Sequence, residues 1–180
     1  MTRNNFKGSQ QYAITSPGIF AKEWKIENNN NNEAFWIQFN LLSPTILSNG
    51  NKDPLGKIYS PKIMSFKKNI DLNLQNSLVK VEWSHSFRTF KLVGDTDVRG
   101  FEKINWVWKR EKFNGKLVLE DYLNGQCIAE FERHRFSRKE VGDLFIYPEL
   151  PEALNLLIIY SASYSFKHIQ RQERSAHGGS

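Results

Sequence analysis

The sequence has little of what many catalytic or disulfide-bonded proteins carry. One cysteine, Cys127, among 180 residues means that no disulfide can form within the chain. A cysteine-rich metal site is excluded for the same reason, and so low a cysteine content is typical of a reducing compartment. The eleven glycines form neither a phosphate-cradling Walker motif nor a nucleophile elbow. These absences argue against the common nucleotide-binding and hydrolase classes.

Long apolar runs and dense charge are also missing. The longest apolar run covers residues 154–166 and is interrupted by Asn155 and three serines, whereas a membrane-spanning helix needs about 20 apolar residues. The polar N-terminal residues lack the apolar core of a signal peptide. The net charge of +6 permits an anionic partner, but there is no basic stripe of the kind that marks a nucleic-acid surface. We therefore expect a cytoplasmic protein without a transmembrane span, either free or peripheral at a membrane.

What the sequence does have is a strong strand pattern. Aromatic residues make up 13% of the chain, and their flat rings pack well on a pleated surface. Apolar and polar residues alternate with a period of two over residues 35–41, 79–84, 103–108 and 117–120. Asn-Gly pairs at 49–50, 114–115 and 124–125 predict tight hairpin turns, and Gly-Asp pairs at 94–95 and 142–143 predict further turns. The spacing indicates about ten to twelve strands, too many for an open sheet that neither curls nor closes.

The pattern changes near the C-terminus. Residues 153–166 are apolar on every side rather than along one stripe, which is typical of a buried helix. Pro151 suits the first helical position, and acidic residues precede the apolar run while basic residues follow it, as the helix dipole favours. We predict a helix over about residues 151–174 that lies inside the sheet. The predicted organisation is a flexible arm (1–12), one domain (13–174) and a disordered tail (175–180).

Many antiparallel strands followed by one apolar helix resemble the tubby C-terminal-like superfamily, which includes the plant LURP-one-related proteins and the phospholipid scramblases. The resemblance lies in residues 101–110, 116–133 and 142–174, and is closest to small fungal members. It implies a mainly β fold with one helix, namely a closed antiparallel barrel of about twelve strands around the C-terminal helix. It also implies phosphoinositide binding through basic side chains on the barrel surface. The lack of a cysteine-rich stretch argues against a palmitoylated, scramblase-type anchor.

Two basic clusters follow strands in the second half of the chain. The candidates for binding an anionic lipid are Lys109, Arg110, Lys112, Arg133, Arg135, Arg138 and Lys139. If the two strand ends are neighbours, the clusters form one anion-binding patch that would attract a phosphorylated headgroup. The alternative is that nearby glutamates neutralise them as exposed ion pairs, each of small energetic value.

Other residues that could carry chemistry have simpler interpretations. Trp83, Trp106 and Trp108 stand at alternate strand positions, which favours the core over a ligand platform. Cys127 is expected to be a small buried residue rather than a reactive thiol. The four histidines lack the spacing of a metal site. No catalytic residue, metal ligand or cofactor is predicted.

The sequence therefore predicts a non-enzymatic binding or adaptor module that recognises anionic phospholipid headgroups. A protein–protein interaction module without lipid binding is the alternative, and a small-molecule enzyme is a third possibility. A barrel that is filled by its own helix has little room for a ligand. We expect any activity to lie on its outside.

Overall fold

The computed structural model describes residues 10–18, 21–40, 43–62, 65–111, 115–134 and 140–177. It contains twelve strands followed by one helix. In chain order these are β1 (Gln10–Thr15), β2 (Glu23–Asn28), β3 (Ala34–Gln38), β4 (Thr45–Ser48), β5 (Pro54–Tyr59), β6 (Lys68–Leu74), β7 (Ser77–His85), β8 (Thr89–Thr96), β9 (Lys103–Arg110), β10 (Leu117–Asp121), β11 (Cys127–Arg133), β12 (Glu140–Ile146) and α1 (Glu152–His177).

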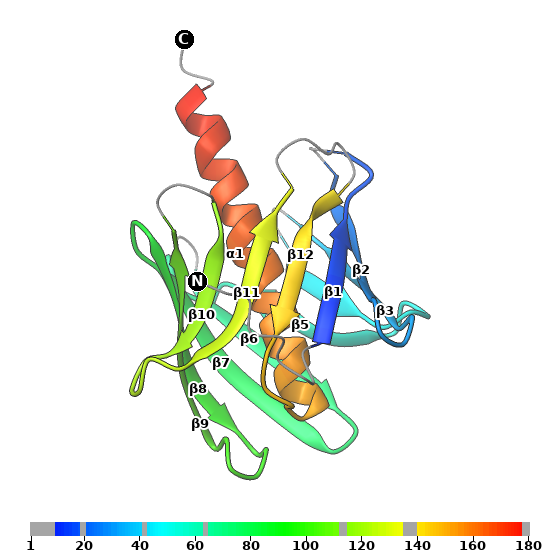
Figure 1. The fold of residues 1–180 in the computed structure, drawn as a ribbon, viewed down its shortest axis with the longest axis vertical. Coiled ribbons are helices and arrows are strands. Elements are labelled where there is room, and N and C mark those ends of the chain that lie inside the picture. The colour runs from blue at the N-terminus through cyan, green and yellow to red at the C-terminus, as the bar shows by residue number, and fades with distance from the viewer. Residues whose placement is uncertain are drawn as a thin grey trace, which may run out of the picture.

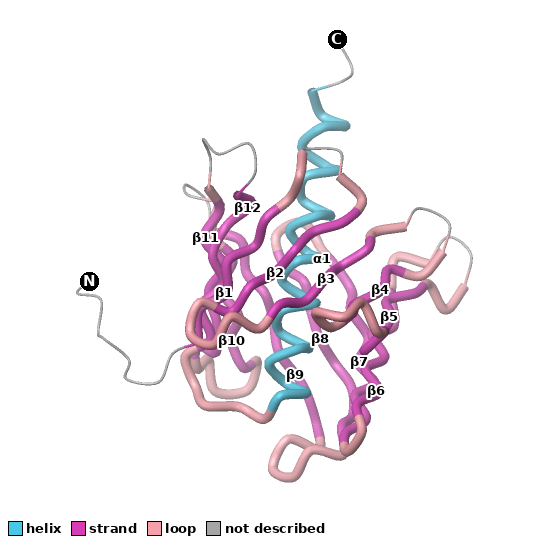
Figure 2. The backbone as a smooth tube through the Cα atoms, turned by 90° about the vertical axis from the view of Figure 1, so that its right-hand side faces the viewer, coloured by secondary structure: helices cyan, strands magenta, loops and turns pink. Residues whose placement is uncertain are grey.

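The strands form a closed barrel in which each strand pairs antiparallel with its neighbours in the sequence (Figure 1). Pairing of β1 with β12, from Gln10 opposite Ile146 to Thr15 opposite Glu140, closes the barrel. The helix α1 runs through the middle, with strands on both sides of it (Figure 2), and its C-terminal end projects beyond the strand ends. This confirms the predicted fold class.

The alternating sequence pattern places one face of each strand inside the barrel. Along β2, Trp24 and Ile26 are buried, while Lys25 and Glu27, which alternate with them, are partly exposed, because successive strand residues point to opposite faces. The three tryptophans of β7 and β9 that were expected in the core are at most 3% exposed. The interior is therefore an aromatic and aliphatic lining made by the inward residues of all the strands.

The helix fills this lining. Its residues 153–163 are all buried, and two of its serines accept hydrogen bonds from indole N–H groups of the wall: Trp108 Nε1 donates to Ser161 Oγ (3.0 Å) and Trp83 Nε1 donates to Ser165 Oγ (2.9 Å). Within the described ranges, no helix is long and apolar enough to span a membrane. The buried position of α1 confirms the prediction from its all-round apolar sequence.

Several predicted boundaries and turns differ in the structure. Gly94 and Gly142, which were expected in turns, lie inside β8 and β12. A Cβ on Gly94 would be 2.2 Å from the carbonyl oxygen of Lys80, and one on Gly142 would be 2.3 Å from that of Glu132. These glycines are needed because a neighbouring strand passes close to them.

The ends of the chain and the best-defined hairpin also differ in detail. β1 begins at Gln10, so three residues assigned to a flexible arm belong to the barrel, and α1 extends three residues into the expected tail. The hairpin at Gly125 joins β10 and β11 as predicted, but through residues 122–126. Gly125 has φ 70°, and the carboxylate of Asp121 accepts the backbone N–H of Leu123 at 2.8 Å. A capped loop therefore replaces the expected two-residue turn.

Because the strands alternate in direction, their connections gather at two ends of the barrel. We call one the helix-exit end: it holds the β5–β6 and β7–β8 connections and the last turns of α1. The other is the helix-entry end, which holds the β2–β3 connection, the β12–α1 connection and the first turn of α1.

Candidate functional site

The predicted basic residues that the structure describes lie near the helix-exit end. Arg110 is the last residue of β9 and Arg133 the last of β11. The intervening strand β10 pairs with both, with Leu117 opposite Arg110 on one side and Phe131 on the other. The two strand ends are therefore close neighbours, as the anion-patch hypothesis requires. Four further candidates, Lys112, Arg135, Arg138 and Lys139, lie outside the described residues.

Arg110 and Arg133 meet at one carboxylate of the helix. Arg110 Nη2 lies 2.5 Å from Glu173 Oε1, and Arg133 Nη1 lies 3.0 Å from Glu173 Oε2. All three side chains are about one-third exposed. Two guanidinium groups on one carboxylate leave a net positive charge. One arginine from each predicted cluster is thus brought to the same carboxylate and partly neutralised by it.

Lys109 does not belong to this group. Its ammonium pairs with Glu120 on the outer surface of β9 and β10, whereas Arg110 points toward the helix. Adjacent strand residues face opposite sides of the sheet, so the two could not share a site even though they are neighbours in the sequence.

Two pockets flank the last turns of α1, and sequence reasoning missed both. The larger exit pocket, about 990 Å³, lies between α1 and the ends of β5, β6 and β7. Its cationic residues are Lys62, Lys68 and Arg171, and no carboxylate is among its described lining residues. The smaller exit pocket, about 740 Å³, lies toward β8 and β9, and Arg171 also lines it.

The two exit pockets differ in whether carboxylates accompany their cationic side chains. In the smaller pocket Arg88, Arg110 and Arg171 stand with Glu111 and Glu173, so most of its positive charge is balanced. In the larger pocket Lys62 and Arg171 are exposed, and within the described part of the chain neither has a carboxylate within ion-pair distance. The larger exit pocket is therefore the more strongly positive of the two.

A histidine pair separates the two pockets. The rings of His85, at the end of β7, and His168 of α1 have centroids 4.3 Å apart. Burial, with help from His85 and Arg171, lowers the pKa of His168 to about 4, and burial and Lys68 lower the pKa of His85. Both imidazoles are consequently neutral at pH 7. This pair was missed because its members are far apart in sequence and have no motif spacing.

Apolar side chains at the tips of two connections complete this end of the barrel. Phe66, before β6, is 79% exposed and Phe87, before β8, is 90% exposed. The Phe66 ring lies 6.2 Å from that of His85, and the guanidinium of Arg88 lies 5.3 Å from the centroid of the Phe87 ring. Exposed rings beside cations mark a surface suited to an interface rather than to bulk water.

The remaining candidates have structural roles. Cys127 is half-buried at a strand irregularity between β10 and β11. Burial, with the charges of Glu130 and Glu120, raises the pKa of its thiol to about 11, so it is poorly reactive. Among the described residues, no group of three His, Cys, Asp or Glu side chains is arranged to hold a metal ion.

The fold on which these pockets lie is a closed twelve-strand antiparallel barrel with one C-terminal helix packed inside it. The structure is similar to the X-ray structure of a protein from Arabidopsis thaliana, AT5G01750, with a TM-score of 0.54 and 16% sequence identity. The match covers 87% of this chain and 91% of the Arabidopsis chain. At this identity the similarity establishes the fold alone. No protein-family model matches the sequence, and no curated protein matches it.

Proposed function

We propose that the chain is a non-enzymatic binding module that docks on anionic phospholipid through the helix-exit end of its barrel. The observation that carries this proposal is the pair of exposed rings, Phe66 and Phe87, on neighbouring connections. They lie at the same end of the barrel as Lys62 and Arg171, which have no carboxylate within ion-pair distance in the described part of the chain. Rings of this kind gain free energy when they leave water for the interfacial region of a bilayer. Each nearby basic side chain adds about 1 kcal/mol at an anionic surface.

The larger exit pocket is the proposed place for the headgroup. Arg171 lies at its edge, and a guanidinium can bind two oxygens of one phosphate. Lys68 is held in the wall by hydrogen bonds to the hydroxyl of Ser60 and the carbonyl of Ser65, so its ammonium is already oriented. These groups support recognition of a phosphorylated headgroup over a purely apolar contact.

The basic clusters predicted from the sequence are proposed as the outer part of the same surface. Arg110 and Arg133 would contribute through their shared pair with Glu173. Lys112, Arg135, Arg138 and Lys139 follow β9 and β11 in the sequence and stay proposed contributors. Lys109 is the least suitable of the seven candidates, because it pairs with Glu120 on the barrel wall. The kinship with small fungal members also stays a prediction.

Vesicle sedimentation tests the proposal. The full chain is mixed with vesicles of phosphatidylcholine alone, with added phosphatidylserine, or with added phosphoinositide. We expect partitioning only onto the anionic vesicles. Reversal of one charge in Arg171→Glu should weaken it roughly thirtyfold, since a change of two charges corresponds to about 2 kcal/mol. Replacing Phe66 and Phe87 by serine should weaken it further.

Matched variants at the opposite end of the barrel control for net charge and apolar content. Arg99 is exposed there, as Arg171 is at the exit end, and Leu123 is 82% exposed. Arg99→Glu and Leu123→Ser should leave partitioning unchanged. Equal effects at both ends, or no partitioning onto any vesicle, would overturn the lipid proposal. The alternative of a protein–protein module would then be favoured by recovery of one stoichiometric protein partner.

A further inference from the structure

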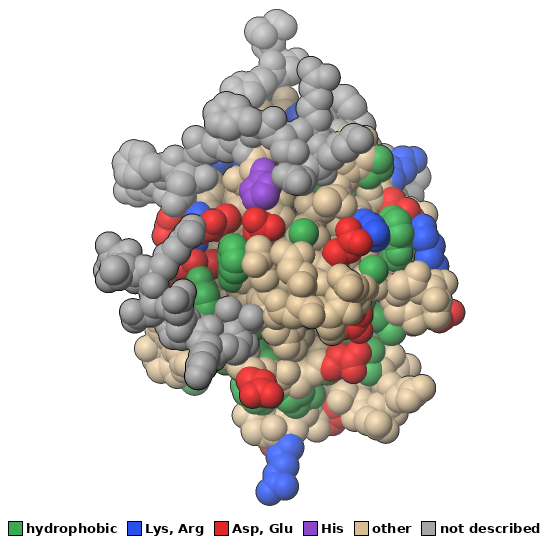
Figure 3. Space-filling view, turned by 45° about the vertical axis from the view of Figure 1, so that its right-hand side comes forward, with side chains coloured by type: hydrophobic (Ala, Val, Ile, Leu, Met, Phe, Trp, Pro, Cys, Tyr) green, Lys and Arg blue, Asp and Glu red, His purple; other side chains and the backbone are tan. Residues whose placement is uncertain are grey.

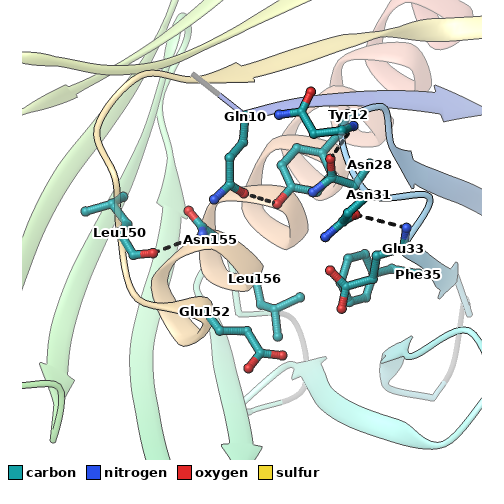
Figure 4. A pocket seen from close by; sticks show the side chains of 11 residues that line it. Gln10, Tyr12, Asn28, Asn31, Glu33, Phe35, Leu150, Glu152, Asn155 and Leu156 are labelled. Carbon is teal, nitrogen blue, oxygen red and sulfur yellow. Dashed lines mark hydrogen bonds between the residues drawn. The ribbon is translucent and has the colours of Figure 1, made fainter. Parts of the chain in front are cut away.

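A third pocket, the entry pocket, lies at the helix-entry end and has the opposite charge. It encloses about 350 Å³ between β1, the β2–β3 connection and the first turn of α1. Figure 4 shows its side chains. Its polar lining comes mainly from Gln10, Tyr12, Asn28, Glu33, Glu152 and Asn155. Two carboxylates and no lysine or arginine are among its described lining residues. On the face of the molecule seen in Figure 3, acidic side chains are more frequent than basic ones over the lower half.

Asn155 supplies a buried hydrogen-bond acceptor that has no donor. Its side chain is in a residue only 7% exposed. The amide Nδ2 donates to the carbonyl oxygen of Leu150 at 3.1 Å (Figure 4), which fixes the orientation of the amide. Its Oδ1 is buried and has no hydrogen-bond partner among the described residues. A buried acceptor without a hydrogen-bond donor lowers the free energy of unfolding by about 1–3 kcal/mol, and a ligand with an N–H group would remove that penalty.

The two carboxylates face this space from opposite sides. Glu33 comes from the β2–β3 connection and Glu152 from the first turn of the helix (Figure 4). Neither forms an ion pair within the described part of the chain. A helix N-terminus alone would attract an anion, but here Glu152 already occupies that position and Glu33 adds a second negative charge. The pocket therefore selects for a cation.

The neighbouring polar side chains are held by hydrogen bonds within the chain. The Tyr12 hydroxyl donates to Gln10 Oε1 at 2.5 Å, so its hydrogen is already used. Asn28 Oδ1 accepts the N–H of Asn30 at 2.8 Å, and Asn31 Oδ1 accepts that of Glu33 at 3.0 Å. The asparagine run thus builds a turn held by its own side chains. That turn places Glu33 at the pocket.

Apolar residues make up the remaining wall. Phe35, Leu150 and Leu156 line the pocket beside the polar groups, and they would contact the methylene carbons of a short chain. The volume is near the lower end of the roughly 300–1,000 Å³ that is typical of small-molecule sites. A slender ligand with a charged donor at its tip matches this combination of walls.

We propose that the entry pocket binds a primary alkylammonium group. In this arrangement an ammonium N–H donates to Asn155 Oδ1, Glu33 and Glu152 balance the charge, and the alkyl chain packs on Leu156 and Phe35. The group can come from a free aliphatic amine or from a lysine side chain of another polypeptide. Both sources present the same chemistry. The proposal is independent of lipid docking, because the two sites lie at opposite ends of the barrel.

Titration of the full chain by heteronuclear NMR tests this. The probes are putrescine, Nα-acetyl-lysine methylamide and, as an uncharged control, n-butanol, all at constant ionic strength. We expect saturable shifts for at least one of the two amines, centred on the amide of Asn155 and on residues 28–33, and none for n-butanol. Saturation by putrescine alone assigns the site to free amines, and saturation by the lysine derivative alone assigns it to a polypeptide side chain.

Variants inside and outside the entry pocket decide whether the amine binds in that pocket. Glu33→Gln and Glu152→Gln should each weaken binding about two- to fivefold, and Asn155→Leu should weaken it tenfold or more. Glu149→Gln removes a charge at an exposed position near the helix start that does not line the pocket, and should have no effect. Should Asn155→Leu fail to fold, the two exposed glutamate variants still decide the matter. Absence of saturation by both amines, or an equal loss in Glu149→Gln, would overturn the proposal.

Discussion

Three buried serines of α1 allow a stringent test of how the helix is held inside the barrel. Ser161, Ser163 and Ser165 are all 0% exposed. Ser161 accepts from the indole of Trp108 and Ser165 from that of Trp83, whereas the hydroxyl of Ser163 has no partner in the described structure. Replacing each serine by alanine removes the same oxygen from the same helix, in two cases where it accepts an indole N–H and in one where it has no partner.

The expected changes in the free energy of unfolding have opposite signs. Ser161→Ala and Ser165→Ala each leave a buried indole N–H without an acceptor, which costs about 1–3 kcal/mol. Ser163→Ala removes a buried hydroxyl that has no partner and should be neutral or stabilising by up to about 1 kcal/mol. The higher helix propensity of alanine, about 0.5 kcal/mol, applies equally to all three. It therefore cancels when the variants are compared with one another.

Urea unfolding followed by tryptophan fluorescence measures these differences. With a slope of about 2 kcal/mol/M, Ser161→Ala and Ser165→Ala should lower the midpoint by about 0.5–1.5 M relative to the parent chain, with the slope unchanged. Ser163→Ala should not lower it. If Ser163→Ala destabilises as much as the other two, loss of packing rather than loss of an acceptor governs the site. The hydrogen-bond argument would then be refuted.

Two further predictions concern titrating groups. Burial lowers the pKa of His168 from 6.5 to about 4. Between these two pH values the unfolded chain binds a proton that the folded chain does not. The free energy of unfolding should therefore fall by about 1–2 kcal/mol as the pH drops from 6.5 to about 4. Urea midpoints should show a shallower fall for His168→Leu, and an identical slope would contradict the assignment. The pKa of the Cys127 thiol is raised to about 11 in the folded chain. The thiol should therefore react with iodoacetamide roughly a hundredfold more slowly in the folded chain than in the chain unfolded by urea. Equal rates would show that folding does not protect the thiol.

The fold was predictable because its two main signals are local. A period of two over short aromatic segments defines strands, and a helix that is apolar all round has to be buried among them. The errors arose where a local signal has more than one cause. A glycine in a strand indicates a turn and a close approach of a neighbouring strand equally well, and Gly94 and Gly142 are of the second kind.

The candidate site was predictable only in part, because it depends on which residues the barrel brings together. Arg110 and Arg133 end inward-facing runs of the two strands on either side of β10, and that much follows from the hairpin pattern. Their shared partner Glu173 lies on the helix, far away in the sequence. The meeting of His85 with His168 likewise depends on how far along α1 the barrel wall reaches. No spacing rule contains that information.

The pairing of β1 with β12 has a consequence for how the chain reaches its native state. The barrel can close only after residue 146 is available, and the helix that fills it comes later still, in the last 26-residue element. Until then the tryptophans of β7 and β9 have no helix to pack against, and β1 presents an unpaired edge that invites pairing with other chains. This closure joins segments from opposite ends of the barrel domain, so it should be a slow step of folding. During synthesis the strands have to wrap around a helix that emerges after all of them, so the interval before the helix emerges is the period of greatest exposure to aggregation.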